Sequence, residues 1–214
     1  MYKEYNEKML YERYPALCVC REKTDKILNM MADTYKSGGK ILLCGNGGSC
    51  ADCDHIVGEL MKSFMCKRSP DENLKQKLEL EFAEDAKKAF GFLQKGVPAI
   101  NLCSQTAILT AYINDVDPDF VYAQLVYGYA KENDMLLCLS TSGNSKNVVN
   151  AAKMARVLGI KTCAITGQKE NMLSQICDVC VCVPETETYK VQELTLPVYH
   201  HLCAMLEIKL FGEE

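Results

Sequence analysis

The stretch Ile41-Leu42-Leu43-Cys44-Gly45-Asn46-Gly47-Gly48-Ser49 decides the fold of this chain. An apolar run ends in a glycine-rich turn, and a helical pattern begins at Ser49. Glycines let the backbone approach an anion closely, and the N-terminus of a helix attracts negative charge. The stretch therefore predicts a buried strand, a phosphate-binding loop and a helix, in that order.

The helix that begins at Ser49 carries two residues suited to chemistry, His55 and Glu59. They lie four residues apart, so both side chains leave the same face of the helix. The sequence thus places an acid/base or metal-binding pair within two turns of the phosphate loop.

The same order of elements repeats further along the chain. An apolar strand at 135–139 runs into Ser140-Thr141-Ser142-Gly143-Asn144-Ser145, and a helix follows from Asn147. Hydroxyls and backbone N–H groups at a helix start form a second anion site. Strands alternate with helices, which predicts a parallel sheet with helices on both faces and ligands beyond the carboxyl ends of the strands. The strands are expected at 40–44, 98–102, 135–139, 161–166 and 179–183.

Three other segments complete the expected organisation of one domain over residues 1–214. Residues 3–37 have helical spacing and form, within 1–39, an N-terminal helical arm. A long final helix is expected from about Thr188 to Phe211. Residues 65–97 mix charges with Leu and Phe, which favours an inserted amphipathic helix whose charged residues, Arg68 among them, face solvent.

Composition narrows the functional class. The net charge is −4 and no Lys/Arg block is present, which argues against a nucleic-acid surface. No apolar run is long enough to span a membrane, and Met1–Tyr5 does not begin like a signal peptide, so we expect a cytoplasmic protein. The thirteen cysteines lie mostly in apolar segments, as in 179–183, which indicates small hydrophobic residues in a reducing compartment. Cys50 and Cys53 have metal or redox spacing, but without a second pair a structural role is favoured.

Several motifs together resemble the sugar isomerase (SIS) domain family, and the resemblance covers nearly the whole chain in order. It rests on Gly45–Ser49 with Asp52, His55 and Glu59, on Ser140–Ser145, and on Gln192-Glu193 with His200. The resemblance implies a flavodoxin-like three-layer α/β fold and a homotetramer with active sites between subunits. It also implies one zinc per site and conversion of sedoheptulose 7-phosphate to D-glycero-D-manno-heptose 7-phosphate.

The residues suit such a reaction in their own right. Moving a carbonyl between C1 and C2 needs a base, an acid and a group that stabilises the enediol oxygen. Glu59 is the candidate base and His200 the candidate acid. The phosphate is assigned to Ser140, Thr141, Ser142 and Ser145, and sugar hydroxyls or phosphate to Asn46, Gly47, Gly48 and Ser49. The family match adds Asp115 and Gln192 as substrate contacts, and makes His55, Glu59, Gln192 and His200 the metal ligands, a nitrogen and oxygen set that suits zinc.

The spacing of two of these ligands suggests a shared site. Gln192 and His200 are eight residues apart, or roughly 12 Å along a helix, whereas zinc bonds are about 2 Å long. We therefore hypothesise that some ligands come from a neighbouring chain, which mixing Glu59→Ala and His200→Ala chains would test. His201 is expected to pack or to face solvent.

Two features depart from the family pattern and leave alternatives open. The segment 65–97 is longer than the usual link, and is expected to cap the pocket or to extend an oligomer contact. Tyr189-Lys190 replaces the usual residues before Gln192, which puts the heptose itself in question. The alternatives are an isomerase of another phosphosugar, or a non-catalytic SIS-domain binding protein of the replication-initiator-associating type. Glu59 and His200 weigh against the non-catalytic alternative.

Overall fold

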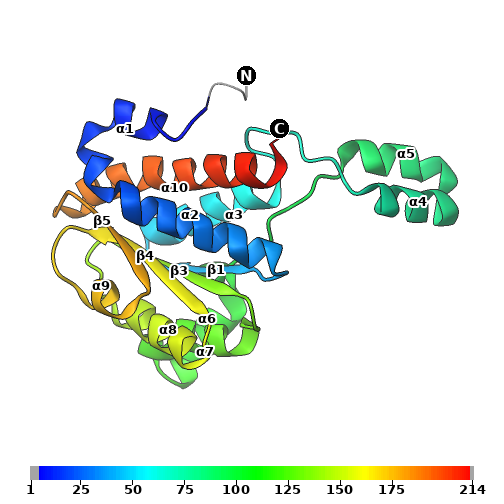
Figure 1. The fold of residues 1–214 in the computed structure, drawn as a ribbon. Helices are drawn as coiled ribbons and strands as arrows, with labels where there is room; N and C mark the ends of the chain where they lie inside the picture. Colours follow the sequence, from blue (N-terminus) through cyan, green and yellow to red (C-terminus); the bar gives the residue numbers. More distant parts are fainter. Residues whose placement is uncertain (1–4, 213–214) are drawn as a thin grey trace.

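The computed structural model describes residues 5–212 and is built on a five-stranded parallel sheet (Figure 1). Residues 1–4, which bear on the expectation about a signal peptide, lie outside the described range. The strands follow one another in the sheet as β2-β1-β3-β4-β5. Leu42 of β1 pairs with Ile100 of β2 on one side and with Leu136 of β3 on the other. The predicted strands are confirmed within a residue or two, as β1 (Ile41–Gly45), β2 (Ala99–Asn101), β3 (Met135–Ser140), β4 (Lys161–Gly167) and β5 (Val179–Val183).

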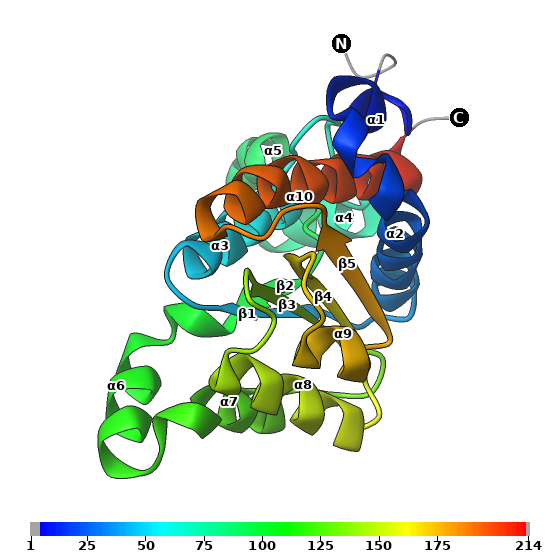
Figure 2. The ribbon, with the colours of Figure 1, turned by 90° about the vertical axis from the view of Figure 1, so that its left-hand side faces the viewer.

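Helices cover both faces of this sheet and make three layers (Figures 1 and 2). Because successive side chains of a strand point to opposite faces, Leu43 and Leu137 enter one core while Leu42 and Leu136 enter the other. The first core is closed by α2 (Arg21–Lys36), α3 (Gly48–Met61) and α10 (Thr188–Phe211). The second is closed by α6 (Thr106–Asp115), α7 (Val121–Tyr129), α8 (Lys146–Val157) and α9 (Met172–Ile176).

The shorter elements refine the expected boundaries. The N-terminal arm is divided into α1 (Met9–Arg13), a 3-10 turn η2 (Pro15–Cys20) and α2, because Pro15 starts a new turn. Two more such turns are η3 (Leu102–Ser104) and η4 (Pro118–Phe120). One helix that was not predicted is α9, five residues long, which Asn171 and Ser174 cap reciprocally.

The inserted segment differs from its prediction in two ways. It forms two short helices, α4 (Glu72–Glu81) and α5 (Ala83–Phe92), that project from the body beside each other (Figure 1). None of the α4 side chains is buried. Leu80 and Phe92 are 87% and 76% exposed, so these two apolar side chains do not pack on the sheet domain. The expectation that Arg68 faces solvent is wrong: Arg68 is buried, because Glu207 and several backbone carbonyls surround its guanidinium.

The order of the strands locates a ligand site. The chain moves outward from β1 to β2 on one side and from β3 to β5 on the other, so the direction reverses between β1 and β3. Ligands bind at the carboxyl ends of the strands on either side of such a switch point. The loops that follow β1 and β3 are the two predicted anion loops.

Two global expectations also bear on function. All thirteen cysteines lie in the described range and are free thiols, consistent with their use as small apolar residues. Among the helices of residues 5–212, none combines the length and apolar character needed to cross a membrane.

Candidate active site

The loop after β1 delivers the N-terminus of α3 to the switch point. Gly47 has φ +55° and precedes the first turn of α3, a conformation that costs glycine little. Ser49 is buried in that turn, and its N–H donates to the carbonyl of Asn46 at 3.0 Å. A side chain at Gly48 would lie 2.5 Å from Gln192 Nε2, so the absence of a Cβ lets α10 approach the start of α3.

A pair of amide side chains ties the first loop to the start of α8, which directly follows the second loop. Asn46 Nδ2 donates to Asn147 Oδ1 at 2.9 Å, and Asn147 Nδ2 donates back to Asn46 Oδ1 at 3.0 Å. Tyr122 fixes the base of the first loop, where its hydroxyl donates to the carbonyl of Gly45 at 2.9 Å. The two predicted anion loops therefore lie side by side, joined across 101 residues of sequence.

The loop after β3 is a compact turn rich in hydroxyl groups. Gly143 has φ +65°, and its N–H donates to Ser140 Oγ at 3.2 Å. The hydroxyls of Ser140 and Ser145 are 3.3 Å apart. Beside the loop lies a hollow of about 190 Å³, lined in part by Thr141, Ser142 and Lys169. Lys169 adds a cation that the sequence analysis did not select, although its position just after β4 was a usable signal.

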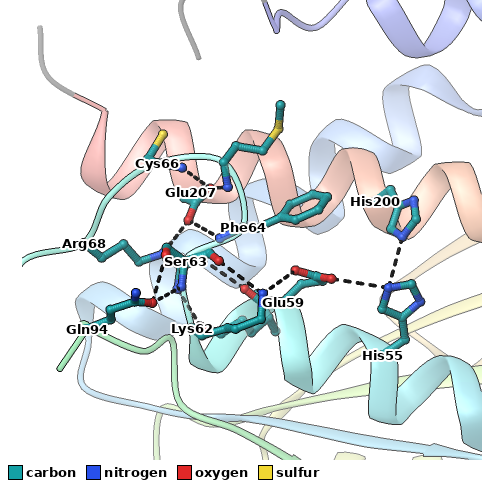
Figure 3. A network of polar contacts seen from close by, with 12 residues as sticks. His55, Glu59, Lys62, Ser63, Phe64, Cys66, Arg68, Gln94, His200 and Glu207 are labelled. Atoms are coloured by element: carbon teal, nitrogen blue, oxygen red, sulfur yellow. Dashed lines mark hydrogen bonds and ion pairs between the residues drawn. The ribbon is translucent and has the colours of Figure 1, made fainter. Parts of the chain in front are cut away.

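The acid/base residues gather where α3 and α10 lie side by side (Figure 3). His55 Nε2 is 3.3 Å from Glu59 Oε1 and 3.4 Å from His200 Nε2. The side chain of Glu59 is 14% exposed and that of His55 is 43% exposed, so the carboxylate is sheltered while the imidazole is open to a ligand. Burial and the neighbouring His55 lower the pKa of His200, and Glu59 opposes this. His200 is therefore a neutral imidazole near pH 7.

A second line of contacts orients His55 from behind. The Tyr199 hydroxyl donates to Asp52 Oδ1 at 3.2 Å and lies 3.0 Å from His55 Nδ1. Because that hydroxyl has one proton, donating it to Asp52 leaves its oxygen to accept from His55 Nδ1–H. This contact orients the His55 ring so that Nε2 faces Glu59 and His200. Tyr199 was not among the predicted site residues, because a Tyr in an apolar helix carries no local signal for this role.

The donor atoms fit zinc in chemistry and in part in spacing. Ligand atoms of a tetrahedral zinc with bonds of about 2.0–2.1 Å lie roughly 3.3–3.4 Å apart, which matches the two separations from His55 Nε2. Glu59 Oε2 is buried with no hydrogen-bond partner, and Lys62 Nζ lies 3.6 Å from it. Within the described part of the chain, however, no three His, Cys, Asp or Glu side chains form a complete metal site. A zinc would thus need a shifted side chain or a further ligand.

The structure does not bring every predicted residue to this cluster. Gln192 lies against Gly48, two turns of α10 before His200, as its spacing required. Asp115 ends α6, is exposed and accepts from Asn114 Nδ2, and α6 packs on the opposite face of the sheet from α3. His55, Glu59 and His200 meet within one chain, which leaves Gln192 as the candidate ligand to be shared with a neighbour.

Four other residues discussed from sequence lie outside the cluster. Tyr189 is 56% exposed in the first turn of α10, one residue after Thr188 in the lining of the hollow. Cys50 and Cys53 are free thiols on α3. His201 is buried on the other side of α10, where the Tyr5 hydroxyl lies 3.0 Å from its Nδ1.

The chain is similar in sequence and in fold to known proteins. The family model of the SIS domain matches residues 109–205. The phosphoheptose isomerase of Aliarcobacter butzleri is 35% identical over 190 residues, which cover 89% of this chain and 87% of that protein. The phosphoheptose isomerase of Akkermansia muciniphila is 31% identical and covers 94% and 93% of the two chains. Among solved structures, phosphoheptose isomerase GmhA from Neisseria gonorrhoeae aligns with a TM-score of 0.71 and 28% identity, over 94% of this chain and 91% of that one.

Proposed function

The chain belongs to the phosphoheptose isomerase family, and we propose that it interconverts sedoheptulose 7-phosphate and D-glycero-D-manno-heptose 7-phosphate through an enediol. The observation that carries this proposal is the meeting of Glu59, His55 and His200 beside two joined anion loops. An aldose–ketose isomerase needs a carboxylate or similar base near a proton donor and an anchor for the phosphate.

We assign the proton transfer between carbons to Glu59. Its carboxylate takes a proton from one of the two reacting carbons and returns it to the neighbouring carbon. The side chain is only 14% exposed, so the reacting carboxylate is largely shielded from solvent. Lys62, at 3.6 Å from Glu59 Oε2, keeps a positive charge beside the carboxylate.

We assign the proton transfer between oxygens to His200. The lowered pKa of His200 keeps its imidazole neutral near pH 7, so it can both donate and accept a proton. His55, held by Tyr199, presents its Nε2 to the same space. The loop at 140–145 would bind the phosphate through hydroxyls and backbone N–H groups, with Lys169 adding charge.

Zinc, oligomeric state and location are further parts of the proposal. His55, Glu59 and His200 would hold the zinc, with Gln192 as an additional ligand. A bound zinc would polarise the substrate oxygen on which negative charge develops. We propose a homotetramer in the cytoplasm, with Asp115 reaching the site of a neighbouring subunit, because α6 lies far from the cluster of its own chain (Figure 2).

The test is an isomerisation assay in D₂O with sedoheptulose 7-phosphate, with zinc added or removed by a chelator. The wild-type protein should form the aldose and incorporate solvent deuterium at carbon. Glu59→Gln should lower kcat by at least about 10²-fold, as expected for loss of a general base. Glu22→Gln, on an exposed ion pair of α2, is the matched control and should leave kcat unchanged. Turnover of a different ketose phosphate, with none of the heptulose, would instead support the alternative substrate.

A mixing experiment and a mass measurement test the shared site. Glu59 and His200 lie in one cluster, so chains carrying Glu59→Ala and His200→Ala are not expected to restore activity when mixed. Chains carrying Glu59→Ala and Asp115→Ala should do so, because one hybrid site would then be intact. Light scattering should give the mass of a tetramer, and a monomer with full activity would contradict the shared site.

A further inference from the structure

One ion pair next to the site is buried completely and takes no part in the chemistry described so far. Arg68 Nε lies 2.6 Å from Glu207 Oε1, and the two side chains are 1% and 0% exposed (Figure 3). A buried ion pair is weak evidence for stability, because removing both charges from water costs about as much as their attraction returns. The role of the Arg68–Glu207 pair is therefore sought in the backbone groups that the two side chains contact.

Glu207 holds the segment that follows α3. Its Oε1 accepts from the N–H of Phe64 at 2.8 Å, and its Oε2 accepts from Cys66 at 2.8 Å and from Met65. The Phe64 ring in turn lies against the His200 ring, with their centroids 5.8 Å apart. Glu207 follows His200 by two turns of α10. One helix therefore contributes both the candidate acid, His200, and the carboxylate that holds Phe64 against it.

Arg68 holds the last turn of α3. Its Nη1 donates to the carbonyl of Leu60 at 2.6 Å, and its Nη2 donates to the carbonyl of Glu59 at 3.1 Å. Carbonyls at the end of a helix have no partner within the helix and attract a cation. The peptide group of the candidate base is thus bonded directly to the guanidinium.

We propose that Arg68 and Glu207 form a positioning pair, which sets the Glu59 carboxylate relative to the His200 imidazole. The pair bonds the end of α3 on one side and is anchored on α10 on the other, so it fixes the two helices that carry the reacting groups. The proposal rests on the proposed function of Glu59 and His200. Neither Arg68 nor Glu207 contacts substrate in this role; each acts through the backbone that it holds.

Kinetics of two variants test the positioning role. Arg68→Lys keeps the charge but loses the planar fork that reaches two carbonyls. It should lower kcat by about 10- to 100-fold, the scale of a misplacement near 1 Å, with KM within about 3-fold. The double variant Arg68→Met/Glu207→Leu leaves no unpaired buried charge and is expected to fold. It should keep a kcat as low as that of Arg68→Lys. Its melting temperature should fall, because the N–H groups of residues 64–66 and the carbonyls of Glu59 and Leu60 lose their partners.

A matched control separates this pair from any Arg–Glu pair. Arg21 lies 2.9 Å from Glu7 with both side chains about half exposed, and Arg21→Lys should leave kcat unchanged. If the double variant regains the wild-type kcat, or does not fold at all, the pair is structural and the proposal is overturned.

The histidines give a readout that does not depend on activity. The chain has three, His55, His200 and His201, so each ring Cε1–Hε1 signal can be assigned from single variants by NMR. In the metal-free double variant, the signals of His55 and His200 should move while that of buried His201 stays. Unmoved signals of His55 and His200 would overturn the positioning role. A wild-type protein that turns over no sugar phosphate would overturn the proposed function, and the histidine signals would still decide the positioning role.

Discussion

Replacing Gly143 with alanine tests whether the loop after β3 has the shape that the site requires. Gly143 has φ +65°, and an added Cβ would lie 2.1 Å from both Cγ and Oδ1 of Asn171. Asn171 cannot turn aside without loss, because it is buried, caps α9 through Ser174 N–H and donates to the carbonyl of Lys169. The substitution therefore strains the loop and displaces the residue behind it.

The expected cost follows from these contacts. A non-glycine residue in the left-handed region costs roughly 1–2 kcal/mol. Loss of the Asn171 cap costs about 1 kcal/mol, and each buried hydrogen bond that it breaks costs about 1 kcal/mol. Gly143→Ala should thus lower the free energy of unfolding by about 3–5 kcal/mol. The affinity for the phosphate should fall with it, because Ser140 bonds to the N–H of residue 143.

Gly159 supplies a matched control. It has φ +75°, and a Cβ there would meet nothing within 4 Å. Gly159→Ala should therefore cost only the backbone term, roughly 1–2 kcal/mol, and leave KM unchanged. Urea unfolding followed by circular dichroism gives both free energies. Equal losses in the two variants would refute the argument that Asn171 closes the space beside Gly143.

Three other outcomes are expected. Replacing residues 72–92 by a short Gly/Ser linker should leave the melting temperature within a few degrees and kcat within about 3-fold. The Lys95 N–H donates to the carbonyl of Arg68 at 2.9 Å, so the two ends of the inserted segment are joined without α4 and α5. A tenfold loss of kcat would place the insertion in the site. Burial lowers the pKa of His201 to about 4, whereas a His in the unfolded chain has a pKa near 6.5. Between these pKa values the unfolded chain binds more protons, so the free energy of unfolding should fall by about 2 kcal/mol from pH 8 to pH 5. His201→Phe should abolish this part of the pH dependence in urea titrations, and an unchanged slope would contradict the expectation. Gly48→Ala should push the flexible end of the Gln192 side chain away from α3. We expect KM to rise at least about 3-fold and the free energy of unfolding to fall by less than about 1 kcal/mol. An unchanged KM would remove Gln192 from the substrate site.

Much of the fold could be predicted from local pattern. Each strand is a short apolar run bounded by turn residues, and both anion loops have their glycine where the backbone has positive φ, at Gly47 and Gly143. The three-layer order follows because parallel strands need helical crossovers. The arrangement of the inserted segment could not be predicted in this way, because a mixture of charged and apolar residues does not show whether a helix packs against another element. The burial of Arg68 could not be predicted either, because it depends on Glu207, which is 139 residues away in sequence.

The candidate site also has features that follow from the sequence and features that depend on tertiary packing. The sequence by itself determined which residues could do chemistry and where the loops would lie, because the helical repeat puts His55 and Glu59 on one face and strand ends meet at one edge of a sheet. Only the tertiary structure decided that His200 meets His55 and that Tyr199 orients the His55 ring. It also decided that Gln192 lies two turns of α10 from His200, against Gly48. These contacts join α3 to α10, and the packing of two helices distant in sequence depends on the whole core between them rather than on any local pattern.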